Sequence, residues 1–250
     1  MTERPRSAIS TSTSDRITVR GLDLTTDLMG KVGLGDMAFL ELLGRLPNSG
    51  ESVVFNAMLV SLVEHGLTPN TLAARLTYLG SPEALQASVA AGVLGLGTVF
   101  VGSIEGAARM LQEALAEEGA GDDLQRLAGV IVEEHLSSRR SIPGLGHPIH
   151  RPVDPRARRL FELASENGLA GSYVELIELI QAEAELRTRR TLPLNVTGAV
   201  GALASELQLP WTICRGVGIM ARCIGIVAHL QEEMRDPIAA EVWRAGERES

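Results

Sequence analysis

The side chains best suited to chemistry gather in one short segment, residues 144–164, with the sequence GLGHPIHRPVDPRARRLFELA. His147 and His150 can exchange protons near neutral pH, and Arg156 can hold a carboxylate or a phosphate through two parallel hydrogen bonds. These residue types lie within ten positions of one another. We therefore expect a loop that binds a small polyanionic substrate and takes part in proton transfer.

The elements that position this loop are predicted to be helices. Asp154 followed by Pro155 is typical of a helix N-cap with proline in the first turn, and Gly144 and Gly146 let the preceding backbone approach a ligand closely. Apolar residues recur at three- and four-residue intervals along most of the chain, which predicts about ten helices. Strand signals are weak, so we expect an all-α protein.

Local signals also predict where some helices begin. Thr68 and Ser81 each precede a proline, as helix caps often do, and Pro210 is expected to open the last long helix. Ser172 and Glu175 have the spacing of a capping box ahead of an apolar run.

Composition limits the class of protein. The chain has 250 residues, of which 45% are hydrophobic and 22% charged, so it can bury the core of one domain or of two lobes. A net charge of -8 argues against a general nucleic-acid binder. Cys214 and Cys223 have no metal-ligand spacing, so we expect neither a disulfide framework nor a metal site, and a cytoplasmic protein.

Two further segments are interpreted from their composition. Residues 1–20 are polar and rich in serine and threonine, which predicts a flexible N-terminal tail without a signal peptide. Between residues 83 and 105 no charged residue occurs, a gap long enough to cross a bilayer. Glycines and polar residues interrupt this gap, and no aromatic belt flanks it. We expect buried helices there and no membrane association.

Four ordered motifs resemble the citrate synthase superfamily. They are GLGHPIHRPVDPRA at 144–157, LVEHG at 62–66, LPLNVTG at 192–198 and MARCIGIVAH at 220–229. The resemblance extends from about residue 21 to the end of the chain. The chain is much shorter than a full citrate synthase, and it looks closer to the stand-alone citryl-CoA lyases and to the equivalent module of ATP-citrate lyase.

The resemblance implies a fold and an activity. It implies an all-α homodimer with a large lobe, residues 21–101 and 204–250, and an inserted small lobe, residues 102–203, with the active site in the cleft between them. The implied reaction cleaves a hydroxyacyl-CoA thioester of the citryl-CoA type to acetyl-CoA and a keto acid such as oxaloacetate. Coenzyme A would take part as thioester substrate and product, together with a di- or tricarboxylate.

The resemblance also assigns roles to histidines. His65 matches the active-site histidine of the first motif, and His147 matches the histidine that meets the substrate hydroxyl or the product carbonyl oxygen. From the residues alone, His65 could instead be a structural histidine at the end of a helix, and His147 a structural loop histidine. His150 has no fixed counterpart and either contacts phosphate or caps the loop.

The arginines divide into two groups. Arg156 and Arg222 match arginines that clamp substrate carboxylates, although Arg156 could also be a solvated helix residue. Arg235, after the last long helix, could reach toward the site of a partner subunit. Arg187, Arg189 and Arg190 form a basic cluster that either meets the phosphates of coenzyme A, together with the glycine loop at Gly144 and Gly146, or is a solvated charge run.

Two positions depart from the family pattern. Where the synthase branch has a histidine before a glycine, this chain has Val101, and the lyase branch also lacks that histidine. The family's carboxylate in the Asn-Val-Asp-Gly motif is replaced by Thr197, and a hydroxyl is rarely ionised at neutral pH. Because general acid–base help is commonly worth about 10²–10⁴-fold, three possibilities stay open: a water held by Thr197, a substitute residue, or a different or lost activity.

These departures leave three functional hypotheses. The first is a citryl-CoA lyase-type carbon–carbon lyase. The second is a citrate or methylcitrate synthase-type condensing enzyme. The third is a catalytically impaired homologue that binds CoA esters or carboxylates.

Overall fold

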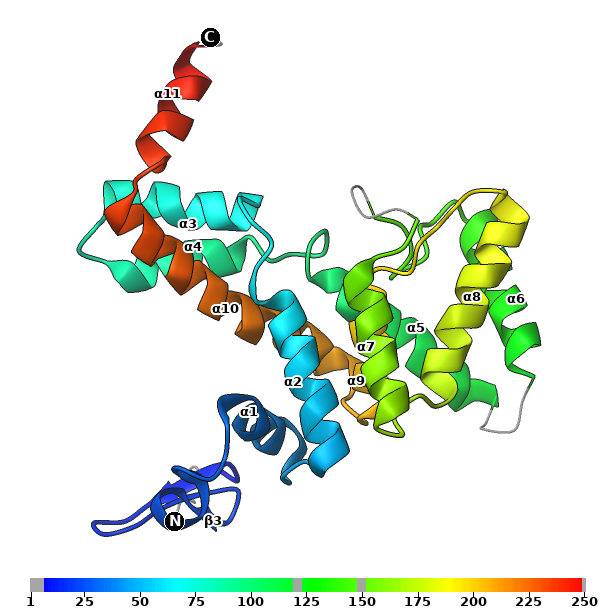
Figure 1. Cartoon of the computed structure of the whole chain (residues 1–250), viewed down its shortest axis with the longest axis horizontal. Helices are drawn as coiled ribbons and strands as arrows, with labels where there is room; N and C mark the ends of the chain where they lie inside the picture. Colours follow the sequence, from blue (N-terminus) through cyan, green and yellow to red (C-terminus); the bar gives the residue numbers. More distant parts are fainter. Residues whose placement is uncertain (1–6, 119–122, 148–151, 249–250) are drawn as a thin grey trace, which may run out of the picture.

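The computed structural model describes residues 7–118, 123–147 and 152–248. Eleven α-helices and one short π-helix, η1, occupy most of these residues, as the all-α prediction requires (Figure 1). Their bounds are η1 Leu24–Leu28, α1 Leu34–Leu43, α2 Ser49–Val63, α3 Pro69–Gly80, α4 Leu85–Leu94, α5 Gly102–Glu118, α6 Leu124–Ser137, α7 Pro155–Glu166, α8 Ser172–Thr188, α9 Val196–Glu206, α10 Trp211–Arg235 and α11 Ala239–Arg248.

A small antiparallel sheet lies near the N-terminus, partly within the segment expected to be a flexible tail. Its strands are β1 (Ser10–Ser12), β2 (Ile17–Val19) and β3 (Leu22–Asp23), in that order. Val19 is buried with Leu28 and Leu40 in a small apolar cluster of its own. The burial of Val19 therefore fixes the end of residues 1–20 against the fold, although the polar composition of that segment predicts a flexible tail.

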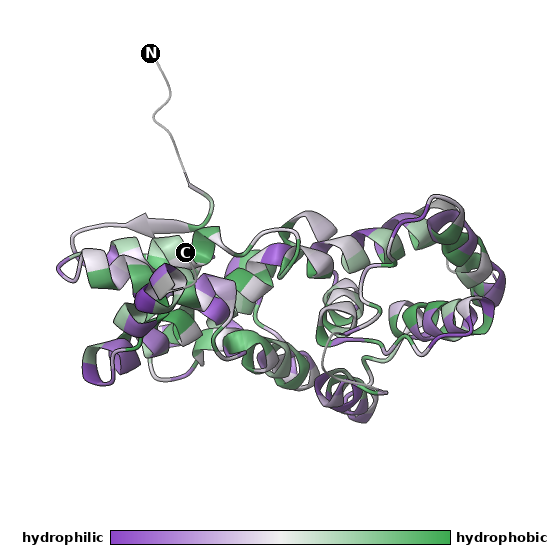
Figure 2. Ribbon diagram, turned by 90° about the horizontal axis from the view of Figure 1, so that it is seen from above, coloured by the Kyte–Doolittle hydropathy of each residue, from purple (hydrophilic) through white to green (hydrophobic). Residues whose placement is uncertain are grey.

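The helices form two groups joined by α10 (Figure 1). Helices α5 to α9 lie together on one side, and α1 to α4 and α11 lie on the other; Figure 2 shows the same elongated arrangement from above. Helix α10 packs against α2, α3 and α4 of one group and against α5 and α9 of the other. The main apolar core is continuous across both groups, so side chains on α10 can place residues of one group relative to the other. The two predicted lobes, residues 21–101 with 204–250 and residues 102–203, stay a prediction.

The local helix signals have mixed outcomes. Helix α3 begins after Thr68 and α10 after Pro210, as predicted. Helix α4 does not begin after Ser81, because the backbone N–H of Ser81 instead closes the last turn of α3.

The predicted capping box at Ser172 is wrong. The N-cap of α8 is Gly171, which has no side chain to accept a capping hydrogen bond. The carboxylate of Glu206, distant in sequence, accepts hydrogen bonds from the backbone N–H groups of Tyr173 and Val174 at 2.9 and 3.1 Å. A tertiary cap thus replaces the local one.

Helix α10 is long and apolar enough to cross a membrane by length and composition. Of its most apolar 18-residue window, 44% is buried inside the fold. Core helices meet the same criterion, so the expected lack of membrane association stays a prediction.

Helices α5 and α9 approach closely at Gly201. A Cβ atom placed on Gly201 would lie 2.8 Å from the Ala107 Cβ and 3.0 Å from the backbone oxygen of Ile104. Such distances leave no room for a methyl group, so this glycine sets the spacing between the two helices.

We expect Gly201→Ala to lower the free energy of unfolding by about 1–3 kcal/mol, because the added methyl group overpacks the contact between α5 and α9. Gly216, on α10, is the matched control. A Cβ there meets only the Ile213 side chain at 3.6 Å, so Gly216→Ala is expected to stabilise α10 by up to about 1 kcal/mol. Urea unfolding followed by circular dichroism measures both effects; equal midpoints for the two variants would contradict this account.

Candidate active site

The two predicted catalytic histidines meet at the junction of two loops. His65 follows the end of α2, and His147 lies in the segment between α6 and α7. Their ring centroids are 6.1 Å apart with an interplanar angle of 73°. His65 is exposed and His147 is half-buried. Both rings are therefore close enough for a small molecule to contact them together.

The backbone that carries His147 is fixed against the start of α9. Gly144 has φ +87°, and a Cβ on it would lie 2.6 Å from the Cα of Gly198, so only glycine fits. The backbone N–H of Asn195 donates to the Gly144 carbonyl at 2.9 Å, and the Gly146 N–H donates to the Pro193 carbonyl at 2.7 Å. The Asn195 side chain also donates to the Gly146 carbonyl at 2.7 Å. The glycine loop is thus held by the segment that begins α9.

Asp154 is the central anion beneath this loop. Its side chain is completely buried and caps α7. One carboxylate oxygen accepts from the Arg156 backbone N–H and Nε, and the other accepts from the Arg156 guanidinium at 2.9 Å and the Val196 N–H at 3.0 Å. Burial by itself raises the pKa of Asp154, but the hydrogen bonds and charge of Arg156 and the Val196 N–H outweigh it and lower that pKa.

Arg156 faces both Asp154 and the candidate catalytic pair. Its Nη2 lies 3.4 Å from the Nε2 of His147. Because a guanidinium only donates, Nε2 can only accept in this contact, which places the ring proton of neutral His147 on Nδ1. Asp154 thereby orients the arginine, and the arginine in turn faces the imidazole.

Arg222 lies on the side of His65. Its Nε donates to the carbonyl oxygen of Leu62 at 3.1 Å, three residues before that histidine. Burial lowers the pKa of Arg222, the nearby Glu64 carboxylate opposes that change, and the positive charge of Arg156 adds to it. The two predicted carboxylate-binding arginines are therefore near enough to feel each other's charge, beside the two histidines.

Thr197 occupies the first turn of α9, where the family pattern has a carboxylate. Its hydroxyl donates to the Asn195 side-chain oxygen at 2.6 Å and accepts from the Ser103 hydroxyl at 3.0 Å. This hydroxyl pair joins the starts of α5 and α9 without any negative charge. Ser103 carries no sequence signal that singles it out.

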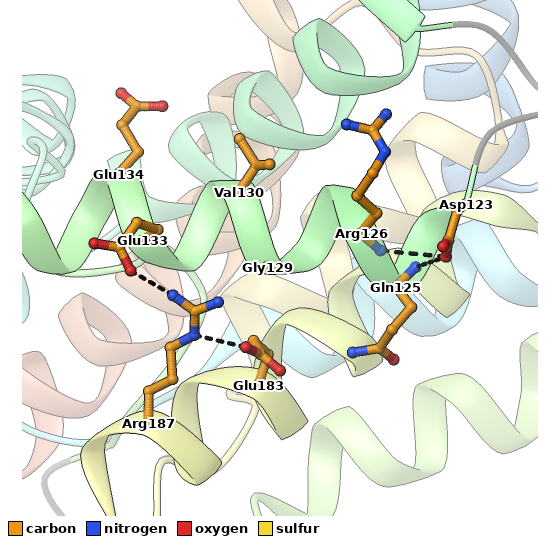
Figure 3. Close-up of a pocket in the computed structure, with 9 residues that line it drawn as sticks. All are labelled: Asp123, Gln125, Arg126, Gly129, Val130, Glu133, Glu134, Glu183 and Arg187. Atoms are coloured by element: carbon orange, nitrogen blue, oxygen red, sulfur yellow. Dashed lines mark hydrogen bonds and ion pairs between the residues drawn. The ribbon is translucent and has the colours of Figure 1, made fainter.

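The three arginines of the predicted basic cluster occupy different positions. Arg187 lies in a surface hollow between α6 and α8, where its guanidinium bonds to Glu133 and Glu183 (Figure 3). Arg189 is the exposed C-cap of α8, and Arg190 lines a separate hollow with Pro152, Thr191 and Leu192. Arg190 therefore lies near Pro152, which follows the segment that carries His147. The role of the three arginines toward coenzyme A stays a prediction.

The remaining predicted residues lie farther out or cannot be placed. Arg235 ends α10, is exposed, and pairs with Asp236 at 2.6 Å, although it also lines a hollow with Glu64 and His229. His150 falls outside the described residues. Within the described ranges, no three histidine, cysteine or acidic side chains gather as metal ligands.

Asp154 and Asn195 have larger roles than their sequence patterns indicate. The sequence predicts a helix cap at Asp154, which also binds the Arg156 side chain and the start of α9. Asn195 belongs to the LPLNVTG motif, and it is both the N-cap of α9 and a hydrogen-bond donor to the Gly146 carbonyl. A polar cap residue beside a predicted ligand-binding loop is a signal for such a double role.

A family model described as "Citrate synthase, C-terminal domain" matches residues 7–245. The chain therefore belongs to the citrate synthase family. Curated relatives include a citrate synthase from Synechocystis sp., 28% identical over 75% of this chain and 46% of its own length, and a probable ATP-citrate synthase from Dictyostelium discoideum, 24% identical over 93% of this chain and 39% of its own. The chain thus spans about half the length of these relatives or less.

Solved structures agree on the fold. The structure of citryl-CoA lyase from Hydrogenobacter thermophilus is 33% identical and covers 94% of this chain and 88% of that chain, with a TM-score of 0.85. ATP citrate lyase from Methanothrix soehngenii, in complex with citrate and coenzyme A, is 23% identical over 93% of this chain and 40% of that chain, with a TM-score of 0.77. The predicted likeness to citryl-CoA lyase and to the module of ATP citrate lyase is confirmed.

We expect the contribution of Asp154 to stability to disappear in acid. Its pKa is lower in the folded than in the unfolded chain, so the contribution is complete above the ordinary value near 4 and is lost as pH falls through the folded value. Above pH 5, Asp154→Asn should therefore lower the free energy of unfolding by about 2 kcal/mol, with a smaller difference below pH 4. Urea titrations from pH 7 to pH 3 measure it; a difference independent of pH would contradict the charged role.

Proposed function

We propose that this protein is a carbon–carbon lyase that cleaves a hydroxyacyl-CoA thioester of the citryl-CoA type. The products would be acetyl-CoA and a keto acid such as oxaloacetate. The observation that carries this proposal is the approach of His65 to His147 beside Arg156 and Arg222. The similarity of nearly the whole chain to a citryl-CoA lyase supports it.

The histidines supply the proton chemistry. Cleavage requires a base to take the proton from the substrate hydroxyl, after which the carbon–carbon bond breaks to leave a keto acid and the enolate of the acyl-CoA. His147 is the candidate for the hydroxyl, because imidazole exchanges protons near neutral pH. Its Nε2 must leave the 3.4 Å contact with Arg156 to take that proton. His65, on the facing loop, is the candidate donor to the developing enolate oxygen. Positioned donors at a growing negative charge are commonly the largest catalytic contribution.

The two arginines would bind carboxylates in different ways. Because buried Asp154 neutralises the charge of Arg156, Arg156 would bind a substrate carboxylate through directed N–H hydrogen bonds and not through net charge. Among the described residues, Arg222 forms no ion pair with a carboxylate, and its Nε donates to a main-chain carbonyl. It therefore keeps guanidinium N–H groups and charge for a substrate carboxylate, the geometry that guanidinium binds well.

The enolate carbon needs a proton from a group other than a carboxylate at position 197. Thr197 already donates its proton to Asn195 at 2.6 Å and accepts from Ser103. A hydroxyl in this arrangement can orient a water molecule but cannot replace an ionisable acid. We therefore expect slower turnover than an aspartate at this position would support.

Coenzyme A would lie beside the histidine loop. A hollow of about 490 Å³ there is lined by Arg190, Pro152, Thr191 and Leu192, and Arg189 is exposed next to it. Exposed arginines suit the phosphates of a nucleotide. The related ATP citrate lyase structure holds citrate and coenzyme A, which supports a thioester substrate here.

Val101 favours cleavage over condensation. It is buried at the start of α5, and its side chain fills the space beside Gly218 of α10. The synthase pattern has a histidine at this position, directly before α5. The apolar side chain of Val101 cannot supply that imidazole.

We further propose that the active form is a homodimer. Apolar side chains remain exposed along α10, among them Ile213, Ile224 and Val227. Repeated exposed apolar residues on a long helix are typical of a protein interface. Light scattering after gel filtration tests this, and a monomer at micromolar concentration contradicts it.

Purified protein mixed with citryl-CoA, malate dehydrogenase and NADH should consume NADH. We expect Arg222→Gln to reduce kcat/KM by roughly 10- to 100-fold, mainly through KM, because one charge-assisted hydrogen bond to a carboxylate is lost. Arg158→Gln is the control, since Arg158 is exposed and pairs only with Glu162 in the described structure. No NADH consumption by the wild type at high enzyme concentration would exclude the citryl-CoA assignment.

Thr197→Asp should increase kcat, by roughly 10-fold or more, because a carboxylate there restores general acid–base help. Thr197→Asn, similar in size but without a charge, is the control and should show no gain. Equal rates for the two variants would mean that position 197 does not deliver the proton.

The same preparation separates the alternatives. Release of free thiol from acetyl-CoA and oxaloacetate would favour a condensing enzyme. Calorimetric binding of CoA esters without turnover in the wild type, under all conditions tested, would favour an impaired binding homologue.

A further inference from the structure

One face of α10 contacts the last residues of α2, directly before His65. Arg222 donates to the carbonyl oxygen of Leu62. At Gly225 the two helices touch so closely that a Cβ would lie 2.1 Å from the carbonyl oxygen of Val63. His229 Nε2 lies 2.9 Å from Oε1 of Glu64. Positions 222, 225 and 229 share a helix face, and they contact three successive residues of the neighbouring chain segment.

The Glu64 carboxylate connects His229 to the backbone of His65. The same oxygen, Oε1, accepts the backbone N–H of His65 at 2.8 Å and that of Gly66 at 2.6 Å. Gly66 has φ +72°, so the chain turns sharply here. A single carboxylate oxygen therefore holds the turn that presents His65, and His229 holds the carboxylate.

Arg75 determines which nitrogen of His229 carries the proton. The Arg75 Nη2 lies 2.8 Å from His229 Nδ1, and a guanidinium only donates. Nδ1 must accept, so the proton resides on Nε2 and points at Glu64. Arg75 is itself 1% exposed and is fixed by ion pairs with Glu233, at 2.8 Å, and with Glu232.

We propose that His229, kept in this tautomer by Arg75, is a positioning residue for His65. The proposal rests on the proposed function, in which His65 is catalytic. His229 acts on His65 through Glu64. Its role is to keep the His65 turn in the geometry that faces His147. Because small displacements of a catalytic group have large effects on rate, its loss should reduce turnover more than substrate binding.

The test compares His229→Phe with His229→Gln. Phenylalanine fills the space but makes neither hydrogen bond, whereas glutamine can donate to Glu64 and accept from Arg75. We expect His229→Phe to lower kcat by roughly 10- to 100-fold with KM within about 2-fold, and His229→Gln to recover most of the rate. His135→Phe, the same change on α6, is the control and should match the wild type.

A second measurement does not depend on activity. Amide hydrogen exchange by NMR should be faster at His65 and Gly66 in His229→Phe, by roughly tenfold, and close to the wild type in His229→Gln. If His229→Phe does not fold, His229→Leu replaces it, because leucine also lacks both hydrogen bonds and adds no bulk; the same exchange increase is expected.

The results separate the two ideas. Wild-type exchange and kcat in His229→Phe, a loss confined to KM, or no recovery with glutamine would overturn the positioning role. An inactive wild type with the expected exchange pattern would leave that role in place and count against the lyase.

Discussion

The candidate site depends on one buried anion, the carboxylate of Asp154. It lies where two helices begin: it caps α7, holds the guanidinium of Arg156 in the first turn of that helix, and accepts the first N–H of α9. A fully buried carboxylate is stable only when charged and polar groups satisfy it, so the anion and its donors require one another. The position of Arg156 beside His147, and the approach of the start of α7 to the start of α9, follow from that requirement.

Much of this organisation could be predicted from the sequence. The capping pattern at Asp154 and Pro155 correctly places the start of α7, because cap signals are local. The four motifs contain His65, His147, Arg156 and Arg222, which the fold brings to one region: His65 follows α2, His147 lies in the loop before α7, Arg156 begins α7, and Arg222 lies midway along α10. The sequence does not show that Asp154 holds the Arg156 guanidinium in the position from which it contacts the His147 imidazole.

What could not be predicted depends on residues far apart in the chain. Glu206 caps α8 from 32 residues away in place of Ser172, and Ser103 reaches Thr197 across 94 residues. In both cases a side chain from a packed neighbour satisfies a polar group, so the local pattern alone could not show the partner. The hairpin formed by β1 and β2 is similar, because Val19 has a buried position that depends on Leu28 and Leu40.

The pairing of Arg156 with Asp154 has a consequence for ionic strength. Together the two groups carry no net charge, whereas Arg222 contributes a positive charge that the nearby Glu64 carboxylate offsets without a direct ion pair in the described structure. Salt screens net charges far more than it weakens short directed hydrogen bonds. An acidic ligand would thus be drawn in through Arg222 over a distance set by the surrounding electrolyte, and aligned by Arg156 only on arrival.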